Sequence, residues 1–278
     1  MNYLIYNGDC LKEMQANIEI DSIDMVFTSP PYTNRRKNLY DSIYEENYIE
    51  WFLHIAEEIK RVLRPTGSFF LNVKPHTNKG ERSLYVNKLV VALKEITKFK
   101  FIDEFAWIKN TYPGGYKGRL KNGWESIFHF SKNMPSNIKF NPLACGNSIK
   151  QASLQRALRK YCGKPKNKSN MGSIKSTNKY LNSKLGRPSN VIYANNVSNQ
   201  YMLKKEHPAT FPIKLVDFFV KTFSDEGDII LDPFMGSGTV GVSCLLNNRK
   251  FIGIDTNEEY CNLAERRILE EVQEYNET

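Results

Sequence analysis

The chain has 278 residues, of which 41% are hydrophobic, and its 39 Lys and Arg against 30 Asp and Glu give a formal net charge of +9. This length and apolar content suit one domain with a modest additional lobe. We expect neither a signal peptide nor a membrane span, because no charged amino-terminal region precedes an apolar core and no apolar stretch is long enough to cross a bilayer. The five cysteines lack paired spacing, which favours reduced thiols in a cytosolic protein over a disulfide framework or a metal site.

Apolar periodicity predicts strands and helices that alternate along much of the chain. Strands are expected at residues 3–6, 23–27, 68–73, 101–108, 125–130, 228–232 and 250–255, with 101–108 and 125–130 as an antiparallel pair. Helices are expected at residues 11–16, 48–63, 84–99, 213–223, 239–247 and 258–275. The polar stretch 33–47 is interpreted as a mobile flap over the substrate.

The second predicted strand runs into an unusual sequence, Thr28-Ser29-Pro30-Pro31-Tyr32. Two consecutive prolines fix their own φ angles, remove two backbone N–H groups and push the preceding residue toward extended geometry. What remains is a rigid edge of carbonyl oxygens, with the Ser29 hydroxyl at its start and the Tyr32 ring at its end. Such an edge can accept hydrogen bonds from a flat amino group while the ring stacks on its face. The plain alternative is a Pro-Pro turn with a surface tyrosine.

The positive charge is concentrated in the segment 126–205, which holds 15 Lys and Arg and no Asp or Glu. The rest of the chain has 24 basic and 30 acidic residues, a net charge of −6. A solvated face normally mixes both signs, so an acid-free run of this length indicates a polyphosphate partner. Within it, residues 163–188 are rich in Lys, Asn, Ser and Gly and are predicted to be mobile without that partner. The alternative is a flexible basic loop with nonspecific affinity.

Near the carboxyl end, a predicted strand ends at Asp232 and runs into Pro-Phe-Met-Gly-Ser-Gly and a helix. A strand, a glycine turn and a helix in this order form the nucleotide-binding corner of a doubly wound α/β sheet. The next strand ends at Asp255, 23 residues after Asp232, about where an acid binds a ribose hydroxyl. The glycine pattern is shorter than G-x-G-x-x-G and occurs once, which favours a mononucleoside cofactor over a dinucleotide. A glycine turn in an ordinary α/β protein is the alternative.

Together, the Ser-Pro-Pro-Tyr element and the later Asp-Pro-Phe-Met-Gly-Ser-Gly element resemble the amino-methylating DNA methyltransferases, which use S-adenosylmethionine. Their order is similar to that of the permuted β class, and Thr-Ser-Pro-Pro-Tyr is most like its cytosine-N4-specific members. The resemblance implies an α/β fold with a doubly wound, mostly parallel seven-stranded sheet, of the circularly permuted Rossmann-like methyltransferase type. It also implies a catalytic half at 1–130, a basic target-recognition region at 131–205 and an S-adenosylmethionine-binding half at 206–278.

Four further segments resemble family elements in the same order. Residues 7–10 are similar to the segment whose acid holds the adenine end of the cofactor, and 63–70 to the helix-to-strand turn after the catalytic motif. Residues 124–130 resemble a strand near the target-base pocket, and 207–212 the segment that packs on the methionine part of the cofactor. The resemblance implies as catalytic residues Thr28, Ser29, Pro30, Pro31 and Tyr32, and as cofactor-binding residues Asp9, Cys10, His207, Thr210, Phe211, Asp232, Pro233, Phe234, Gly236, Ser237, Gly238, Thr239 and Asp255.

The chemistry that this resemblance implies follows from the substrate. An exocyclic base amine is a weak nucleophile, because its lone pair is delocalised into the ring. The carbonyl groups of Ser29 and Pro30 and the Ser29 hydroxyl would hold its hydrogens, while Tyr32 stacks on the base once it is flipped from the duplex. The cofactor brings an activated sulfonium methyl group, so we expect direct in-line displacement. No Pro-Cys dipeptide is present, which argues against a covalent cysteine mechanism.

The target amine and the partners follow from the same comparison. Ser before Pro-Pro-Tyr is more typical of cytosine-N4 enzymes and Asp or Asn of adenine-N6 enzymes, so cytosine N4 is favoured and adenine N6 is the alternative. An RNA or protein-amide methyltransferase could share the loop, but the permuted order and the basic insert favour double-stranded DNA. A non-enzymatic DNA-binding protein would not need the cofactor corner. The resemblance allows a homodimer and a cognate restriction endonuclease acting separately, in the bacterial cytosol or nucleoid and without a membrane partner.

Overall fold

The computed structural model describes residues 2–33, 43–78, 80–109, 117–148, 185–195 and 211–277. They belong to two compact units, one formed by 1–139 with 190–278 and the other by 140–189. In the second unit, β8 (Asn147–Ser148) pairs antiparallel with β9 (Leu185–Gly186). The larger unit carries the sheet and both motifs of the preceding section. Most of the predicted flap at 33–47, and most of the stretch 163–188 predicted to be mobile, lie outside the described residues.

An eight-stranded sheet forms the centre of the larger unit, in the order β1-β12-β11-β2-β3-β7-β6-β10. Its strands are β1 (Tyr3–Asn7), β2 (Ile23–Thr28), β3 (Leu63–Asn72), β6 (Lys100–Ile108), β7 (Trp124–Ser131), β10 (Val191–Tyr193), β11 (Ile229–Asp232) and β12 (Lys250–Asp255). Strand β7 is antiparallel to both of its neighbours, and all other pairs are parallel. The mostly parallel α/β sheet and the antiparallel pair β6–β7 are therefore confirmed. The short β10 adds an eighth strand at the edge to the seven that we expected.

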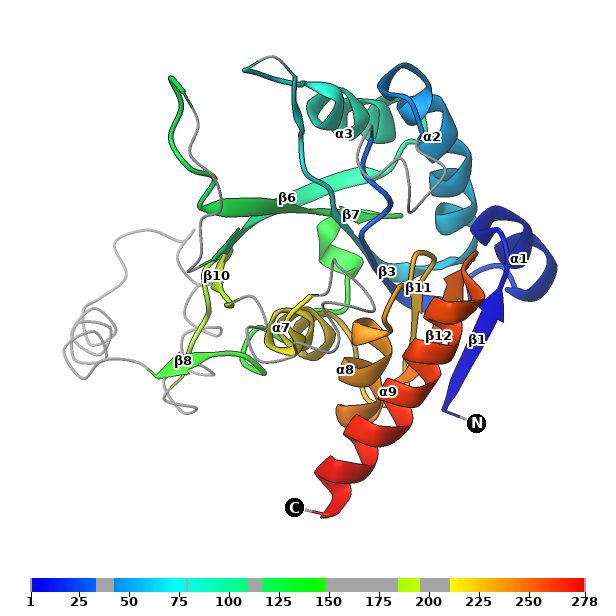
Figure 1. The fold of residues 1–278 in the computed structure, drawn as a ribbon. Helices are drawn as coiled ribbons and strands as arrows, with labels where there is room; N and C mark the ends of the chain where they lie inside the picture. Colours follow the sequence, from blue (N-terminus) through cyan, green and yellow to red (C-terminus); the bar gives the residue numbers. More distant parts are fainter. Residues whose placement is uncertain are drawn as a thin grey trace. The chain divides into compact units, whose positions relative to one another are not determined.

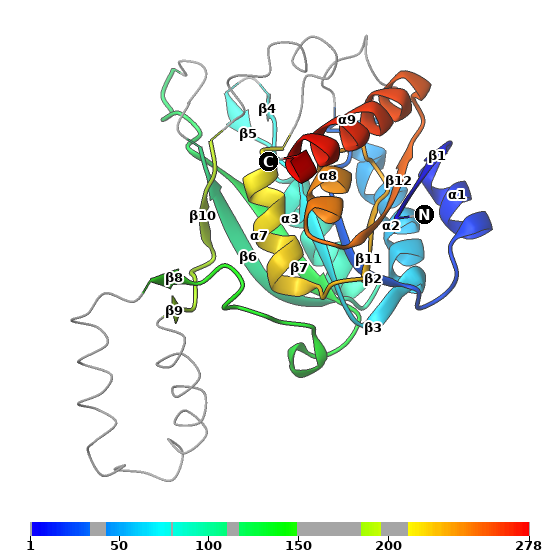
Figure 2. The ribbon, with the colours of Figure 1, turned by 90° about the horizontal axis from the view of Figure 1, so that it is seen from below.

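Helices cover both faces of this sheet (Figures 1 and 2). They are α1 (Cys10–Asn17), α2 (Glu45–Val62), α3 (Tyr85–Glu95), α7 (Ile213–Phe223), α8 (Thr239–Leu246) and α9 (Glu258–Glu277), with a short 3-10 turn at Pro135–Asn137. Alternate strand residues point to opposite faces. Val26 and Phe69 accordingly pack in one core with α1, α2 and α3. Phe27 and Phe70 pack in a second core with α7, α8 and α9. Burial on both faces explains why these strands read as continuous apolar runs.

Three element boundaries differ by three residues or more from the sequence-based expectation: the starts of α2 and β3, and the end of α3, which lies at Glu95 rather than at residue 99. Helix α2 begins at Glu45, so the last three residues of the predicted flap are helical. Glu45 and Glu46 lie in the first turn of α2, where acidic side chains interact favourably with the helix dipole. Strand β3 begins at Leu63 rather than Ser68, because Leu63 pairs with Ile23 ahead of a register shift in β2.

The chain connections fix where a ligand can bind to this sheet. Strands β11 and β2 are neighbours. From β11 the chain passes through α8 to β12, and from β2 it passes through α2 to β3, on the opposite face and toward the opposite edge. The strand order therefore reverses between β11 and β2. In open α/β sheets, ligands bind outside the carboxyl ends of the strands at such a switch point.

A hairpin and one strand start lie on the same side of the sheet as the carboxyl ends of β2, β3 and β11. Strands β4 (Thr77–Asn78) and β5 (Glu81–Arg82) form a small antiparallel hairpin between β3 and α3. Strand β7 starts at this edge because it runs antiparallel to β3. The carboxyl ends of β2, β3 and β11 and the start of β7 thus border one side of the sheet.

Candidate active site

The two sequence motifs meet at the switch point. We call residues 28–33 the Pro-Pro loop and residues 232–239 the glycine loop. Thr28 ends β2 and Asp232 ends β11, and the Thr28 Oγ1 hydroxyl donates a hydrogen bond of 2.6 Å to Asp232 Oδ1. Both side chains are buried. The Pro-Pro loop and the glycine loop, whose first residues are 204 positions apart in sequence, are therefore joined at their starts by one buried hydrogen bond.

The carboxyl group of Asp232 has an unusual environment. Burial raises its pKa to about 7, although the hydrogen bonds from Thr28 and from the Phe234 N–H act in the opposite direction. The Phe234 N–H donates to the same Oδ1 atom at 3.1 Å. This carboxyl thus changes its charge near neutral pH, at the point where the glycine loop and the Pro-Pro loop both begin.

The Pro-Pro loop presents its polar groups next to the end of β3. The Ser29 hydroxyl lies 3.5 Å and the Tyr32 hydroxyl 3.4 Å from Asn72 Oδ1. Asn72 is 1% exposed, and its Nδ2 donates to the Ser126 carbonyl at 2.9 Å. Sequence reasoning missed Asn72. Its signal was a lone amide at the end of the apolar run Phe69-Phe70-Leu71, although that signal does not reveal its partners.

The glycine loop depends on backbone conformations that favour glycine. Gly236 has φ 52° and Gly238 has φ 74°, both in the left-handed region. A Cβ at Gly238, the N-cap residue of α8, would lie 2.7 Å from the Ala264 Cβ of α9. Absence of side chains lets the loop turn tightly against α9 and leaves its backbone close to any ligand at the strand ends.

Asp255, at the end of β12, holds this loop in place. Its Oδ2 accepts the Gly236 N–H at 2.9 Å and its Oδ1 accepts the Asn257 N–H at 2.9 Å. Burial raises the pKa of Asp255, and these two N–H groups oppose the rise. A carboxylate offers about four acceptor positions, so both oxygens retain capacity for ribose hydroxyls.

The amino-terminal candidates lie beside the same strand end. The Gly8 N–H donates to the Asp255 carbonyl at 3.0 Å, which joins the ends of β1 and β12. Asp9 is exposed and caps α1, since its Oδ1 accepts the Lys12 N–H at 3.1 Å. Cys10 is buried, and burial raises its thiol pKa to about 12, so it packs rather than reacts.

The segment expected to pack on the methionine part of the cofactor is described only in part. Phe211 contacts Phe27 and Trp107, with ring centroids 5.4 and 6.0 Å apart. It therefore lies against β2 one residue before Thr28. His207 and Thr210 lie outside the described residues.

Arg267 of α9 supports the glycine loop, and sequence reasoning missed it. Its Nη1 donates to the Ser237 carbonyl at 2.6 Å, to the Ser237 hydroxyl at 3.1 Å and to the Thr239 hydroxyl at 3.2 Å. It is 5% exposed and pairs with Glu271. An arginine in the buried stripe of a terminal helix, four residues before a glutamate, was the available signal.

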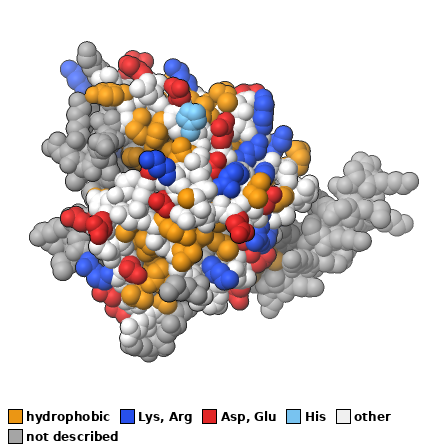
Figure 3. Space-filling model, turned by 90° about the vertical axis from the view of Figure 1, so that its right-hand side faces the viewer, with side chains coloured by type: hydrophobic (Ala, Val, Ile, Leu, Met, Phe, Trp, Pro, Cys, Tyr) orange, Lys and Arg blue, Asp and Glu red, His pale blue; other side chains and the backbone are white. Residues whose placement is uncertain are grey.

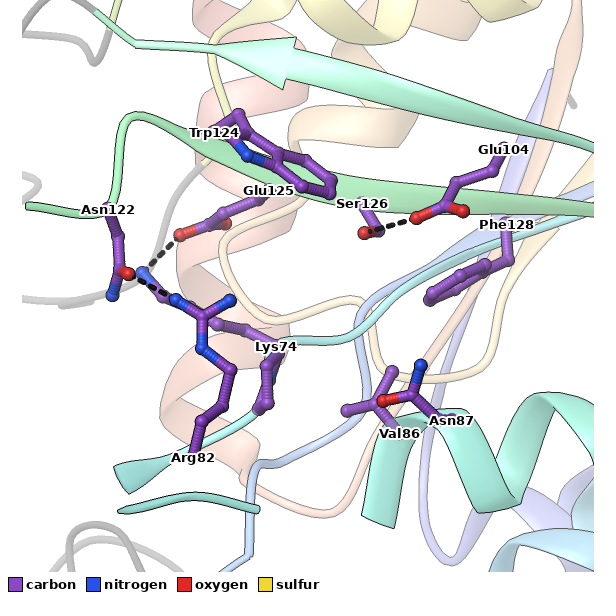
Figure 4. A pocket seen from close by; sticks show the side chains of 11 residues that line it. Lys74, Arg82, Val86, Asn87, Glu104, Asn122, Trp124, Glu125, Ser126 and Phe128 are labelled. Atoms are coloured by element: carbon purple, nitrogen blue, oxygen red, sulfur yellow. Dashed lines mark hydrogen bonds and ion pairs between the residues drawn. The ribbon is translucent and has the colours of Figure 1, made fainter. Parts of the chain in front are cut away.

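A cavity of about 160 Å³ lies between β7 and the segment that follows β3 (Figure 4), and one of its lining residues, Ser126, accepts the hydrogen bond from Asn72. Its wall is formed by Lys74, Pro75, Arg82, Val86, Asn87, Glu104, Asn122, Trp124, Glu125, Ser126 and Phe128. Lys74 Nζ and Lys109 Nζ lie 2.6 and 2.7 Å from Glu125 Oε1. Burial acts to raise the pKa of Glu125, but the two lysines outweigh it and hold this pKa below its ordinary value. Trp124 is 49% exposed, so an apolar ring and several polar groups face the same space.

The switch-point site and the glycine loop define a Rossmann-like protein that binds a nucleoside-type cofactor. A family model described as DNA methylase, for N6 and N4 methyltransferases, matches residues 23–266. The chain therefore belongs to this family of amino-methylating DNA methyltransferases, and the resemblance drawn from the two motifs is confirmed.

Individual relatives cover nearly the whole chain. The orphan methyltransferase M.BamHII of Bacillus amyloliquefaciens is 32% identical over an alignment of 264 residues that covers 92% of this chain and 92% of its own. The type II methyltransferase M.PvuII of Proteus hauseri is 27% identical over 97% of this chain and 84% of its own. The DNA adenine methyltransferase YhdJ of Escherichia coli K12 is 29% identical over 95% of this chain and 82% of its own.

Solved structures support the fold. The PvuII DNA methyltransferase (cytosine-N4-specific) superposes with a TM-score of 0.71 at 24% identity, covering 98% of this chain and 92% of that one. An M1.HpyAVI complex with S-adenosylmethionine superposes with a TM-score of 0.59 at 23% identity, covering 96% and 98%. S-adenosylmethionine is the cofactor of this family, as expected. The residues at the switch point fit this cofactor, because acidic side chains suited to ribose hydroxyls flank a loop that presents backbone groups rather than side chains to the ligand.

In the part of the chain that the structure describes, no helix combines the length and the apolar character that a membrane crossing requires. No group of three or more His, Cys, Asp and Glu side chains in those residues is arranged to hold a metal ion.

Proposed function

We propose that this DNA methyltransferase transfers the methyl group of S-adenosylmethionine to the N4 amine of cytosine in double-stranded DNA. The observation that carries the choice of base is the Ser29 hydroxyl, which lies 3.5 Å from Asn72 Oδ1 at a position where Asp or Asn is more typical of adenine-N6 enzymes. The likeness to M.PvuII supports it, since the PvuII DNA methyltransferase is named as cytosine-N4-specific. Adenine N6 is the second candidate, because YhdJ, named as an adenine methyltransferase, is similar over 95% of the chain.

Each part of the cofactor has a proposed partner at the switch point. Asp255 holds the ribose hydroxyls, and Asp9 at the adjacent strand end holds the adenine side. Residues 233–239 of the glycine loop line the cofactor, and Asp232 with Phe211 lies toward its methionine end. S-adenosylmethionine supplies an activated methyl group when bound. The protein's task is to align the acceptor amine with that methyl group.

The Pro-Pro loop performs that alignment in our proposal. The Ser29 and Pro30 carbonyl groups, in a stretch with no backbone N–H at Pro30 or Pro31, accept the two amine hydrogens. Tyr32 stacks on the extruded base. The cavity lined by Ser126 accommodates part of the DNA substrate, with the exposed Trp124 ring at its wall. The amine proton leaves to solvent after methyl transfer.

The positive charge of residues 126–205 supports DNA as the substrate, although not all of its 15 basic residues are available to bind it. Lys132 pairs with Asp21, and Lys139 pairs with Asp24 and Asp228, so two of the 15 cations in 126–205 stabilise the larger unit instead. Arg187 stacks on Phe140 within the smaller unit, and the other 12 lie outside the described residues. The face in Figure 3 mixes basic and acidic side chains among the described residues, as a solvated surface does. We therefore assign duplex binding to the target-recognition region at 131–205.

A homodimer, a separate cognate endonuclease and a location in the bacterial cytosol stay predictions.

Nucleoside analysis tests the proposal. Unmethylated duplex DNA is incubated with the protein and S-adenosylmethionine, digested to nucleosides and analysed by mass spectrometry, with Tyr32→Ala as the control of reduced activity. We expect N4-methyldeoxycytidine. N6-methyldeoxyadenosine alone would select the second candidate, and no methylated base from the folded wild-type protein would refute the function.

A further inference from the structure

His76, which sequence analysis did not single out, joins the end of the Pro-Pro loop to the start of α2 and to the residues just before α3. Its Nδ1 lies 2.9 Å from the Thr33 hydroxyl at the end of that loop. Its Nε2 lies 3.1 Å from Glu45 Oε2 in the first turn of α2. The Ser83 N–H, just before α3, donates to the His76 carbonyl at 3.0 Å, and the Ser83 hydroxyl donates to the Glu45 carboxylate at 2.5 Å.

The environment of this bridge is largely buried. Thr33 is 0% and His76 is 9% exposed, whereas the Glu45 side chain is 37% exposed. The Tyr85 ring packs against His76 with ring centroids 5.7 Å apart, and the Tyr85 hydroxyl donates to the Lys74 carbonyl at 2.7 Å. The imidazole is therefore held on several sides by groups with fixed positions.

The hydrogen-bond roles follow from the chemistry of the partners. An ionised Glu45 carboxylate only accepts, so the Nε2 of a neutral His76 carries the hydrogen. Nδ1 then accepts the hydroxyl hydrogen of Thr33. In a protonated His76, Nδ1 donates to the Thr33 oxygen instead, since a hydroxyl can also accept. Both contacts survive in either state, which indicates a fixed brace rather than a pH switch.

This brace complements the junction at the other end of the loop. Thr28 anchors the amino end of the Pro-Pro loop to Asp232, and Thr33 anchors its carboxyl end to His76, each through a buried hydroxyl. Between them, two prolines remove backbone N–H donors. The contacts of Ser29 and Tyr32 with Asn72, at 3.5 and 3.4 Å, are longer than the 2.9 Å of Thr33 with His76.

We propose that His76 is a positioning residue for methyl transfer, which fixes the carboxyl end of the Pro-Pro loop through Thr33 and couples it to the start of α2 through Glu45. The inference rests on the proposed role of this loop in binding the target amine. Displacements of about 1 Å in a reacting geometry can cost about a hundredfold in rate, so loss of one anchor has a measurable effect on the transfer step itself.

The test compares Thr33→Val, which removes the hydroxyl at nearly constant volume, with Thr33→Ser, which retains it. Single-turnover methyl transfer is measured with enzyme and cofactor in excess, alongside cofactor affinity by calorimetry and the melting temperature. We expect the rate constant of Thr33→Val to fall by about tenfold or more, with cofactor affinity within about twofold, and that of Thr33→Ser to stay near wild type. Thr222→Val is the matched control, because Thr222 is also buried and its hydroxyl has no hydrogen-bond partner among the described residues.

Several results would overturn the inference. A wild-type transfer rate for Thr33→Val would show that the hydroxyl is irrelevant. The same conclusion would follow if Thr33→Ser lost as much of the transfer rate as Thr33→Val. Should Thr33→Val fail to fold, Glu45→Ala at the more exposed side of the bridge replaces it. We expect this variant to transfer about threefold more slowly, and an unchanged rate would reject the brace. An inactive wild-type protein would instead reject the proposed function.

Discussion

The buried hydrogen bond between Thr28 and Asp232 makes a quantitative prediction about stability. Thr28→Val removes the hydroxyl that donates to Asp232 Oδ1 at 2.6 Å and leaves the Phe234 N–H on that atom. Burial raises the folded-state pKa of Asp232 to about 7, above an unfolded value of about 3.9. Ionisation of this carboxyl therefore opposes folding increasingly as the pH rises toward 7 and reaches its full cost above it.

The hydroxyl of Thr28 stabilises the ionised form, which sets the pH dependence of the variant. At about pH 6 the folded-state carboxyl is mostly protonated, and we expect Thr28→Val to lower the free energy of unfolding by about 1 kcal/mol. At about pH 8.5 the carboxylate is ionised, and the loss grows to about 1.5–3 kcal/mol, the range for a hydrogen bond to a charged group. The mechanism predicts the sign of this change as well as its size.

Urea denaturation of the wild-type protein and the variant at both pH values measures the difference. Thr222→Val serves as the control, since its buried hydroxyl has no hydrogen-bond partner among the described residues and its loss is expected to be small and independent of pH. A loss from Thr28→Val that is equal at the two pH values, or larger at the lower one, would refute the assigned environment of Asp232.

Three further predictions concern the loops themselves. Ser29→Ala and Tyr32→Ala are expected to lower turnover by about tenfold or more with nearly unchanged cofactor affinity in calorimetry; a large loss of affinity would move the Pro-Pro loop out of the substrate site. Asp255→Ala should weaken S-adenosylmethionine binding by about tenfold or more, because it removes the proposed ribose acceptor, and equal dissociation constants would exclude Asp255 from the site. Arg267→Met should lower the free energy of unfolding by about 1–3 kcal/mol, because it leaves buried acceptors of the glycine loop without their donor. Arg266→Met, at the exposed neighbouring position, is the matched control, and equal effects of the two substitutions would deny Arg267 its support of the loop.

The sequence was informative wherever a local rule determines structure. Apolar runs and helical spacing located the strands and helices of the sheet, because both depend on residues near one another. The order of the two motifs identified the family, which the match to residues 23–266 confirms. The glycine turn also had a local signature, since Gly236 and Gly238 adopt positive φ angles that other residues avoid.

The supporting residues could not be predicted in the same way. Asn72, His76 and Arg267 each act through partners that lie 30 to 54 residues away in sequence, and those partners are set by strand register and helix packing. The start of α2 at Glu45 was missed because the first turn carries charges rather than an apolar stripe. Strand β10 has three residues inside the basic segment, too few for a period to be recognised.

A crystal structure with S-adenosylhomocysteine bound tests the central claim most directly, because it locates the reacting sulfur relative to both loops. We predict that the ribose contacts Asp255 and that the sulfur faces the space in front of Ser29 and Tyr32, across the junction of β2 and β11. Binding of the nucleoside elsewhere on the sheet, or a sulfur turned away from the Pro-Pro loop, would contradict the account.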